Sequence, residues 1–312
     1  MDAKPDEGHA RTAARQALGW PRVDSVRRFG TGTSFFVFEV VCGTQRAVVR
    51  MGIDAQRSVL KDGLELWQRL APLDLPLPRI FADGTDQPLP FTVLERLPGV
   101  DLGAVIHTLG DRQLRHIAAA VAEAQHRVGS LGAGSSFGYA ARPGDAPFAR
   151  WDEVVAANLD RSRRRLAQHA VFSPDHADRL QAKLDDLRPA MARLPALPFL
   201  HDTTTKNVII APQGHLSGIV DVDDLCYGDP RYVIGLSRAA LISLGQPFRY
   251  ADFWLAASGL CEDTVSAFYT PLFLLDFMSE HGAAFNGNQP VSDAVERARI
   301  EGQFLAALEA LS

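Results

Sequence analysis

Short apolar runs separated by turn residues occupy the first hundred positions of the chain. Residues 35–41 and 46–51 flank the turn sequence Cys42-Gly43-Thr44-Gln45, which predicts two strands joined by a tight turn. Further short runs within 76–84 and 90–99 predict two more strands. Residues 57–70 place apolar side chains on one face at helical spacing, which predicts a helix before the third strand.

Beyond about residue 100 the apolar positions recur at the spacing of long helices. Asp111 and Ser173 are suitable helix caps, and Pro174 suits a first helical turn. Strands followed by a run of helices are typical of the α+β class, so we expect two lobes, over residues 1–97 and 98–312. The helices are expected over 111–131, 151–168, 173–194 and 229–244, and from about 248, 263 and 292.

The composition fits a soluble enzyme. The chain has 312 residues, a formal net charge of −5 and a pI near 6.0, which argues against nucleic acid as a partner. No apolar run approaches the roughly 18 residues of a membrane span, and the charged start does not resemble a signal peptide. Cys42, Cys226 and Cys261 have no metal-like or disulfide-like spacing, so we expect a cytoplasmic protein.

Three oxygen-bearing side chains carry the candidate chemistry. Asp202 and Asn207 stand five apart before an apolar run, and Asp221 ends the next run after the turn Pro212-Gln213-Gly214. The two runs predict a hairpin that brings Asn207 and Asp221 together. A carboxylate that orients a hydroxyl, beside oxygen ligands for Mg²⁺, suggests ATP-dependent phosphoryl transfer. For each piece alone, a capping or turn residue is the simpler interpretation.

The order of these pieces resembles the aminoglycoside phosphotransferase and choline kinase-like family, from about residue 23 to about residue 245. The resemblance implies a protein-kinase-like fold with a small antiparallel sheet lobe and a larger helical lobe. It rests on Asp202, Asn207, Asp221 and Gly228-Asp229-Pro230, which follow the family's His-x-Asp-(x)4-Asn loop, metal-binding Asp and Gly-Asp-Pro order. The chain departs from this pattern, because Leu200 takes the His position and His201 the usual Gly position.

The segment before residue 35 contains small residues that suit phosphate binding. A loop between strands that contains Gly30, Gly32, Thr33 and Ser34 would let main-chain amides approach phosphate oxygens closely. An ordinary hairpin turn is the alternative. In the family the second strand after this loop carries a cation for the α and β phosphates, and the resemblance assigns that role to Arg50.

The acidic partner of Arg50 is not evident from the sequence. The family commonly has Glu on the following helix, and Gly63 occupies that position here. Asp62 and Glu65 lie nearby, so either would serve after a small rotation of the helix. The resemblance also implies that main-chain groups of Glu95 to Leu97 bind adenine, and a plain linker is the other reading of this segment.

The acceptor is expected to be a small molecule with a hydroxyl group. Residues 251–296 contain acidic side chains and no Lys or Arg, and an acidic cleft would attract a cation. This favours an aminoglycoside-like molecule or an amino alcohol. Exposed helix faces explain the same acidic residues, and aromatic residues in this region fit either a pocket or the core.

The sequence therefore predicts a small-molecule kinase that uses ATP and Mg²⁺. Asp202 would be the catalytic residue and Asn207 and Asp221 the metal ligands. A nucleotide-binding regulator that has lost catalysis is one alternative, encouraged by Leu200 and Gly63. A metal-dependent hydrolase is a weaker one, because the chain lacks a second His at ligand spacing. Its ligands would come from the cluster His201, Asp202, Asp221, Asp223 and Asp224.

Overall fold

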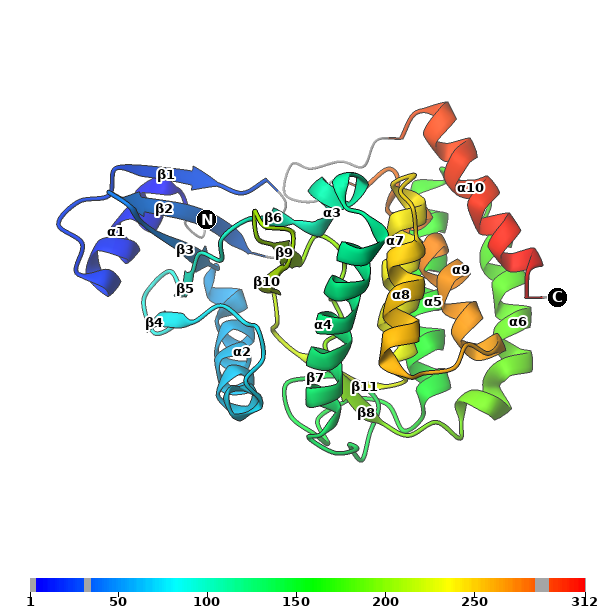
Figure 1. The fold of residues 1–312 in the computed structure, drawn as a ribbon. Coiled ribbons are helices and arrows are strands. Elements are labelled where there is room, and N and C mark those ends of the chain that lie inside the picture. Colours follow the sequence, from blue (N-terminus) through cyan, green and yellow to red (C-terminus); the bar gives the residue numbers. More distant parts are fainter. Residues whose placement is uncertain (1–3, 31–34, 284–291, 312) are drawn as a thin grey trace.

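A five-stranded antiparallel sheet forms the first part of the molecule in the computed structural model, which describes residues 4–30, 35–283 and 292–311 (Figure 1). The strand order is β1-β2-β3-β5-β4. The helices of this part are α1 and α2. The elements are α1 (Glu7–Leu18), β1 (Ser25–Arg28), β2 (Phe36–Cys42), β3 (Gln45–Met51), α2 (Arg57–Leu70), β4 (Ile80–Gly84) and β5 (Phe91–Glu95).

The two faces of this sheet have different environments. Successive side chains of a strand point to opposite faces, so Ala47, Val49 and Met51 of β3 lie on one face and Val48 and Arg50 on the other. The first face packs against the buried alanines of α1 in one apolar cluster. The second face lines a cavity. The alternation of β3 therefore directs Arg50 away from the apolar cluster and into the cavity.

The larger part consists mainly of helices, with short strands between them (Figure 1). Its short strands form two three-stranded sheets in the described residues, with the orders β10-β9-β6 and β7-β11-β8. The strands are β6 (Val100–Asp101), β7 (Gly138–Ala140), β8 (Leu197–Phe199), β9 (Val208–Ile210), β10 (Leu216–Ile219) and β11 (Leu225–Gly228). The helices are α3 (Leu102–Val105), α4 (Asp111–Gly129), α5 (Trp151–His169), α6 (Asp175–Met191), α7 (Arg231–Ser243), α8 (Arg249–Ser258), α9 (Thr264–Glu280) and α10 (Ala294–Glu309).

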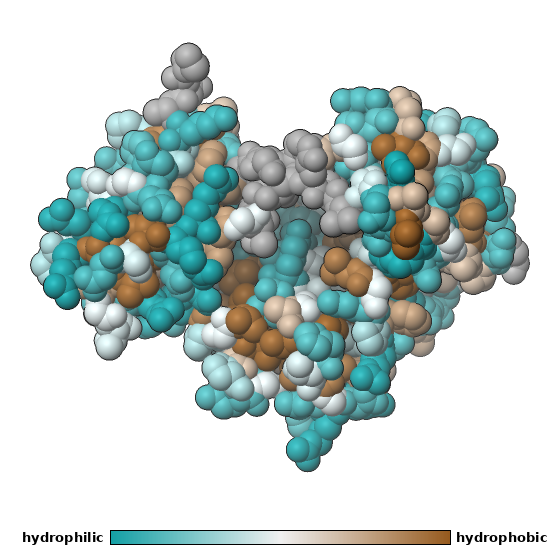
Figure 2. Space-filling model, turned by 90° about the horizontal axis from the view of Figure 1, so that it is seen from above, coloured by the Kyte–Doolittle hydropathy of each residue, from teal (hydrophilic) through white to brown (hydrophobic). Residues whose placement is uncertain are grey.

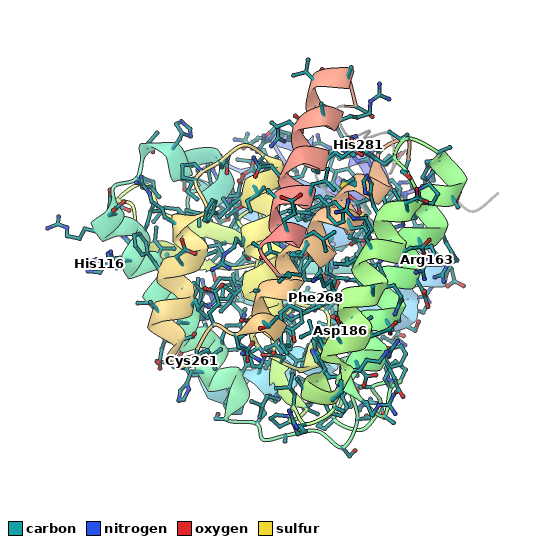
Figure 3. The ribbon with its side chains drawn as sticks, turned by 90° about the vertical axis from the view of Figure 1, so that its right-hand side faces the viewer. His116, Arg163, Asp186, Cys261, Phe268 and His281 are labelled. Atoms are coloured by element: carbon teal, nitrogen blue, oxygen red, sulfur yellow. The ribbon has the colours of Figure 1, made fainter. Side chains whose placement is uncertain are left out.

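The core of the larger part lies around α9. Phe268 of this helix is fully buried, and Figure 3 labels it among the helices of this part, whereas Asp186 of α6 is exposed. Every helix in the described part of the chain is too short or too polar to cross a bilayer.

A chain of buried hydrogen bonds connects α5, α9 and the start of α7. The Trp151 indole donates to the Tyr269 hydroxyl (2.7 Å), which donates to the Asp229 carboxylate (2.8 Å). Asp229 also accepts from Arg231 at 2.7 Å, and its side chain accepts from the Arg231 main-chain amide at the start of α7. The carboxylate is only 4% exposed, so these donors replace the water it gives up on burial. The Gly-Asp-Pro motif therefore joins three helices.

Gly99 is the point where the chain passes from the sheet to the helical part. Its φ is +111°, and a Cβ at this residue would lie 1.9 Å from the Ile210 carbonyl oxygen. Only glycine tolerates both the backbone conformation and this approach. The strand β6 can therefore pair directly with β9, which follows Asn207.

The α+β, protein-kinase-like two-lobe fold is confirmed, and most predicted elements are found. The helix over 57–70 has the predicted bounds, and the predicted hairpin after Asn207 forms from β9 and β10. The sequence reasoning missed α1, β1 and the strands β6, β7, β8 and β11. These strands have two to four residues, too few for a period to be recognised. The lobe boundary at residue 97 stays a prediction.

We predict that Tyr269→Phe destabilises the protein by about 1–3 kcal/mol, because it leaves the buried Trp151 N–H and the Asp229 carboxylate without a shared partner. Tyr250→Phe is the matched control, because the hydroxyl of this buried tyrosine has no hydrogen-bond partner among the described residues. Its removal should be neutral or stabilising. Urea unfolding measures both free energies, and equal losses in the two variants would contradict the structural role given to Tyr269.

Candidate active site

A cavity of about 540 Å³ lies between the sheet and the hairpin of β9 and β10. This volume is within the roughly 300–1,000 Å³ range of small-molecule sites. Figure 2 shows a hollow between the smaller and the larger part of the molecule. The cavity lining includes Asp202, Asn207, Asp221, Arg50 and Leu97, so it brings together predicted site residues from four separate segments.

The hairpin places Asn207 beside the segment that contains Asp221. The Val220 amide donates to the Asn207 carbonyl at 2.9 Å, and Val208 pairs with Ile219 in the strand register. The Asn207 side-chain amide donates to the Asp202 carbonyl oxygen at 2.8 Å. Asn207 thus closes the loop that begins at Asp202 and also adjoins Asp221, as the spacing in the sequence predicted.

Gln125 holds the start of this loop and was not identified from the sequence. Its side-chain amide donates to the Leu200 carbonyl and accepts from the Leu200 amide, both at 2.9 Å. It also donates to the Thr203 hydroxyl at 3.1 Å. Leu200 itself is buried in an apolar cluster. The loop is therefore fixed by a buried glutamine of α4, and the one signal for it is a Gln on the otherwise apolar face of that helix.

Asp221 has a left-handed backbone conformation, with a φ of +64°. Aspartate is one of the few residues other than glycine that adopts it readily. Its side chain is 51% exposed to the cavity, so water reaches it. The surrounding walls still desolvate the group and raise its pKa, an effect that Arg50 opposes and the charges of Asp223 and Asp202 reinforce. The cavity thus concentrates carboxylates that a cation would stabilise.

Arg50 crosses the cavity from β3 to the segment after β10. Its two terminal nitrogens bind the two carboxylate oxygens of Asp223, and one of them also lies 3.1 Å from Asp221 Oδ1. The guanidinium lies 3.9 Å from the centroid of the Phe35 ring, a cation–π contact. Burial lowers the pKa of Arg50, but the hydrogen bond and charge of Asp223 more than offset this and raise it above its usual range.

Neither acidic residue proposed on α2 pairs with Arg50. Glu65 instead binds Arg142, and Asp62 is exposed. Neither residue lines the cavity. The helix instead brings Gly63 and Trp67 to the 221–223 segment, where the Trp67 indole donates to the Val222 carbonyl at 2.8 Å. The expected small rotation of the helix is therefore wrong, and Asp223 supplies the carboxylate.

The remaining nucleotide-site predictions have different outcomes. Gly32, Thr33 and Ser34 lie outside the described residues, and Gly30 is exposed after β1. Glu95 and Leu97 line the cavity. The Glu95 amide donates to the Arg79 carbonyl at 2.8 Å, and the Leu97 carbonyl accepts from the Arg96 guanidinium. These two main-chain groups are thus engaged within the protein.

The acidic residues of 251–296 are largely compensated by arginines, most of which lie on other helices. The pairs are Asp252 and Glu262 with Arg238, Asp263 with Arg231, Asp276 with Arg161 and Arg165, Glu280 with Arg165, and Glu296 with Arg299. The segment lacks basic residues of its own, but α5 and α7 supply most of them, and Arg299 follows Glu296 one turn later on α10. The expectation that these residues form an uncompensated acidic cleft is therefore not supported.

The residues at the cavity suit Mg²⁺ by their chemistry. Asn207 and Asp221 offer amide and carboxylate oxygens, which are the ligands this hard cation prefers. Asp221 is open to the cavity, and the Asn207 amide nitrogen is occupied by the Asp202 carbonyl, which leaves its side-chain oxygen as the atom for a cation. This donor set fits a magnesium ion carried in with a nucleotide.

Comparisons with known proteins agree with this geometry. A family model described as "Phosphotransferase enzyme family" matches residues 25–269. No protein with a curated description matches the chain by sequence.

Similar folds are found among solved structures. One is a thermostable mutant of aminoglycoside phosphotransferase APH(4)-Ia with AMP-PNP and hygromycin B, 17% identical, with a TM-score of 0.67 over 96% of this chain and 98% of that chain. Another is the streptomycin–ATP–APH(2'')-IIa complex, 14% identical, with a TM-score of 0.62 over 97% of each chain. A third, the GDP complex of an aminoglycoside 2'-phosphotransferase-IIIa mutant, is 15% identical, with a TM-score of 0.64 over 98% of this chain and 96% of that chain.

We predict that Asp221→Ala weakens the binding of an ATP analogue in the presence of Mg²⁺ by about tenfold or more, about 1.4 kcal/mol. Binding without Mg²⁺ should change little, because the lost carboxylate is a ligand of the metal. Titration calorimetry with and without Mg²⁺ measures both affinities. Asp186→Ala, exposed on α6, is the control for an Asp→Ala change. An equal loss under both conditions would argue against a metal ligand at this position.

Proposed function

The chain belongs to the phosphotransferase enzyme family, and from that premise we propose that it transfers the γ-phosphoryl group of ATP to a hydroxyl group of a small molecule. It is a small-molecule kinase by family. The observation that carries the proposal is the convergence of Asp202, Asn207 and Asp221 at one cavity, opposite Arg50.

The proposed roles follow from the chemistry of each side chain. The Asp202 carboxylate accepts a hydrogen bond from the substrate hydroxyl. It orients this hydroxyl toward the γ-phosphorus and receives its proton. Asn207 and Asp221 would hold Mg²⁺, which would neutralise phosphate charge. Lys206 also lines the cavity, and we assign it a contact with the γ-phosphate.

The nucleotide would lie against the sheet. Arg50 holds the α and β phosphates, and the loop of Gly30, Gly32, Thr33 and Ser34 covers them. The apolar face formed by Val48 and Leu94 would receive the adenine ring. We propose that the Glu95 carbonyl and the Leu97 amide contact the edge of the adenine ring. The Glu95 amide and the Leu97 carbonyl are already engaged within the protein.

For the acceptor we propose an amine-bearing alcohol, such as an aminoglycoside or an amino alcohol. The support is the family together with solved neighbours that hold hygromycin B or streptomycin. The acidic residues of 251–296 add little to this argument, because arginines compensate them. A remaining source of negative potential is the group Asp202, Asp221, Asp223 and Asp224, of which Arg50 offsets only a part.

The metal-dependent hydrolase has little support. In the described part of the chain no three His, Cys, Asp or Glu side chains converge as ligands of a metal ion. His201 Nδ1 lies 3.0 Å from Asp224 Oδ1 without a well-directed hydrogen bond, and Asp223 is bound by Arg50.

The catalytically impaired regulator differs from a kinase in turnover, which a transfer assay measures directly.

We predict that Asp202→Ala reduces phosphate transfer by at least about a thousandfold, because both orientation and proton transfer are lost. The affinity for the ATP analogue should stay within about threefold of the wild-type value, which is about 0.7 kcal/mol. Transfer from radiolabelled ATP and calorimetric titration measure the two quantities. A variant that loses nucleotide binding but keeps its turnover would contradict the role of Asp202.

We also predict that amine-bearing alcohols raise the melting temperature more than matched alcohols without an amine, because a ligand of the folded form stabilises it. A thermal-shift screen in the presence of an ATP analogue tests this. ATP and GTP are then compared as phosphate donors in the transfer assay. Stabilisation confined to neutral or anionic alcohols would overturn the proposed acceptor class and leave the phosphotransferase assignment intact.

A further inference from the structure

We propose that Asp223 is the positioning residue that holds Arg50 for phosphate binding, and that Gly63 is the adaptation of α2 that makes room for it. The inference rests on the proposed function, because it concerns the cation assigned to the α and β phosphates. In this arrangement the carboxylate partner of Arg50 does not lie on the helix. It lies on the segment that also carries Asp221, the proposed metal ligand.

The first observation is the geometry of the ion pair. Asp223 binds both terminal nitrogens of Arg50 with its two oxygens, whereas Asp221 contacts one of them at 3.1 Å. A two-pronged pair between a planar guanidinium and a carboxylate fixes the orientation of both groups. The Arg50 side chain is 12% exposed and that of Asp223 is 24% exposed, so water screens this pair less than a surface pair.

The second observation is the close approach of α2. A Cβ at Gly63 would lie 3.3 Å from Asp223 Oδ1 and 3.7 Å from its Cα. Any longer side chain at this position would need the space that Asp223 occupies. One turn later on the same face, Trp67 donates to the Val222 carbonyl at 2.8 Å and fixes the main chain beside Asp223. The helix therefore supports the carboxylate from behind instead of providing one.

The arrangement assigns the binding of Mg²⁺ and the pairing with Arg50 to two different carboxylates. Asp221 is needed by Mg²⁺, so it cannot also be the permanent partner of Arg50 when the nucleotide is bound. Asp223 would keep the guanidinium in place and leave Asp221 available to hold the metal. Without Asp223, Arg50 would pair with Asp221 and oppose binding of the cation. Asp223 thus positions Arg50 and does not itself touch the reacting atoms.

A charge-relocation experiment tests the inference. The variants are Asp223→Asn, Asp223→Ala, Gly63→Glu with Asp223→Ala, and Gly63→Gln with Asp223→Ala. The last two place side chains of nearly equal shape in the space that Asp223 vacates, and only one of them carries a charge. Affinity for the nonhydrolysable ATP analogue with and without Mg²⁺, turnover, and the melting temperature of each variant are measured.

We expect Asp223→Asn and Asp223→Ala to weaken analogue binding roughly 10- to 100-fold, the size expected when a charge-assisted hydrogen-bond pair is lost. The loss should persist without Mg²⁺, because Arg50 acts on the phosphates directly. Gly63→Glu with Asp223→Ala should recover most of the affinity, and the Gln counterpart should not. Such non-additive effects of the substitutions at positions 63 and 223 are expected for residues in contact.

Three results would overturn the inference. One is a loss in the Asp223 variants that disappears without Mg²⁺, which would make Asp223 a metal ligand. A second is equal affinity of the Glu and Gln double variants. A third is wild-type affinity in Asp223→Asn, a variant that keeps the shape of the side chain and does not depend on α2 tolerating a new residue. A wild-type protein that binds no nucleotide would instead overturn the proposed function.

Discussion

The contact between Arg50 and the 221–223 segment is the interaction on which the site depends. It joins a strand of the small sheet to the loop that follows the hairpin of the larger part, across the cavity where the nucleotide is proposed to bind. A guanidinium with little access to water needs carboxylate partners, and these come from residues 171 and 173 positions later in the chain. The same approach of the sheet to the 221–223 segment therefore encloses the cavity and pairs Arg50.

The larger part of the molecule provides the rigidity that this contact requires. Gln125 fixes the loop before Asp202, and the chain from Trp151 through Tyr269 to Asp229 fixes the segment after Asp224. Phosphoryl transfer depends mainly on positioning and electrostatics, so small displacements of the loop would matter. The buried polar groups thus form a frame around the hairpin, while Asp202 and Asp221 line the cavity.

The sequence predicted the fold class, the hairpin and the convergence of Asn207 and Asp221, because these follow from local periodicity and spacing. It did not predict the partner of Arg50 or the role of Gln125, because both depend on contacts between residues far apart in the chain. The acidic segment 251–296 illustrates the same limit. Its local composition indicated a negative surface, and only the packing of α5 and α7 around it brings most of the arginines that compensate it.

The most direct measurement is anomalous diffraction from crystals grown with Mn²⁺ and a nonhydrolysable ATP analogue, since Mn²⁺ takes oxygen ligands like those of Mg²⁺. The account predicts a manganese peak between the analogue phosphates and the side-chain oxygens of Asn207 and Asp221, at about 2.1 Å from each, with Asp202 facing the γ-phosphate. A nucleotide bound outside the cavity, or a metal held without Asn207 and Asp221, would contradict it.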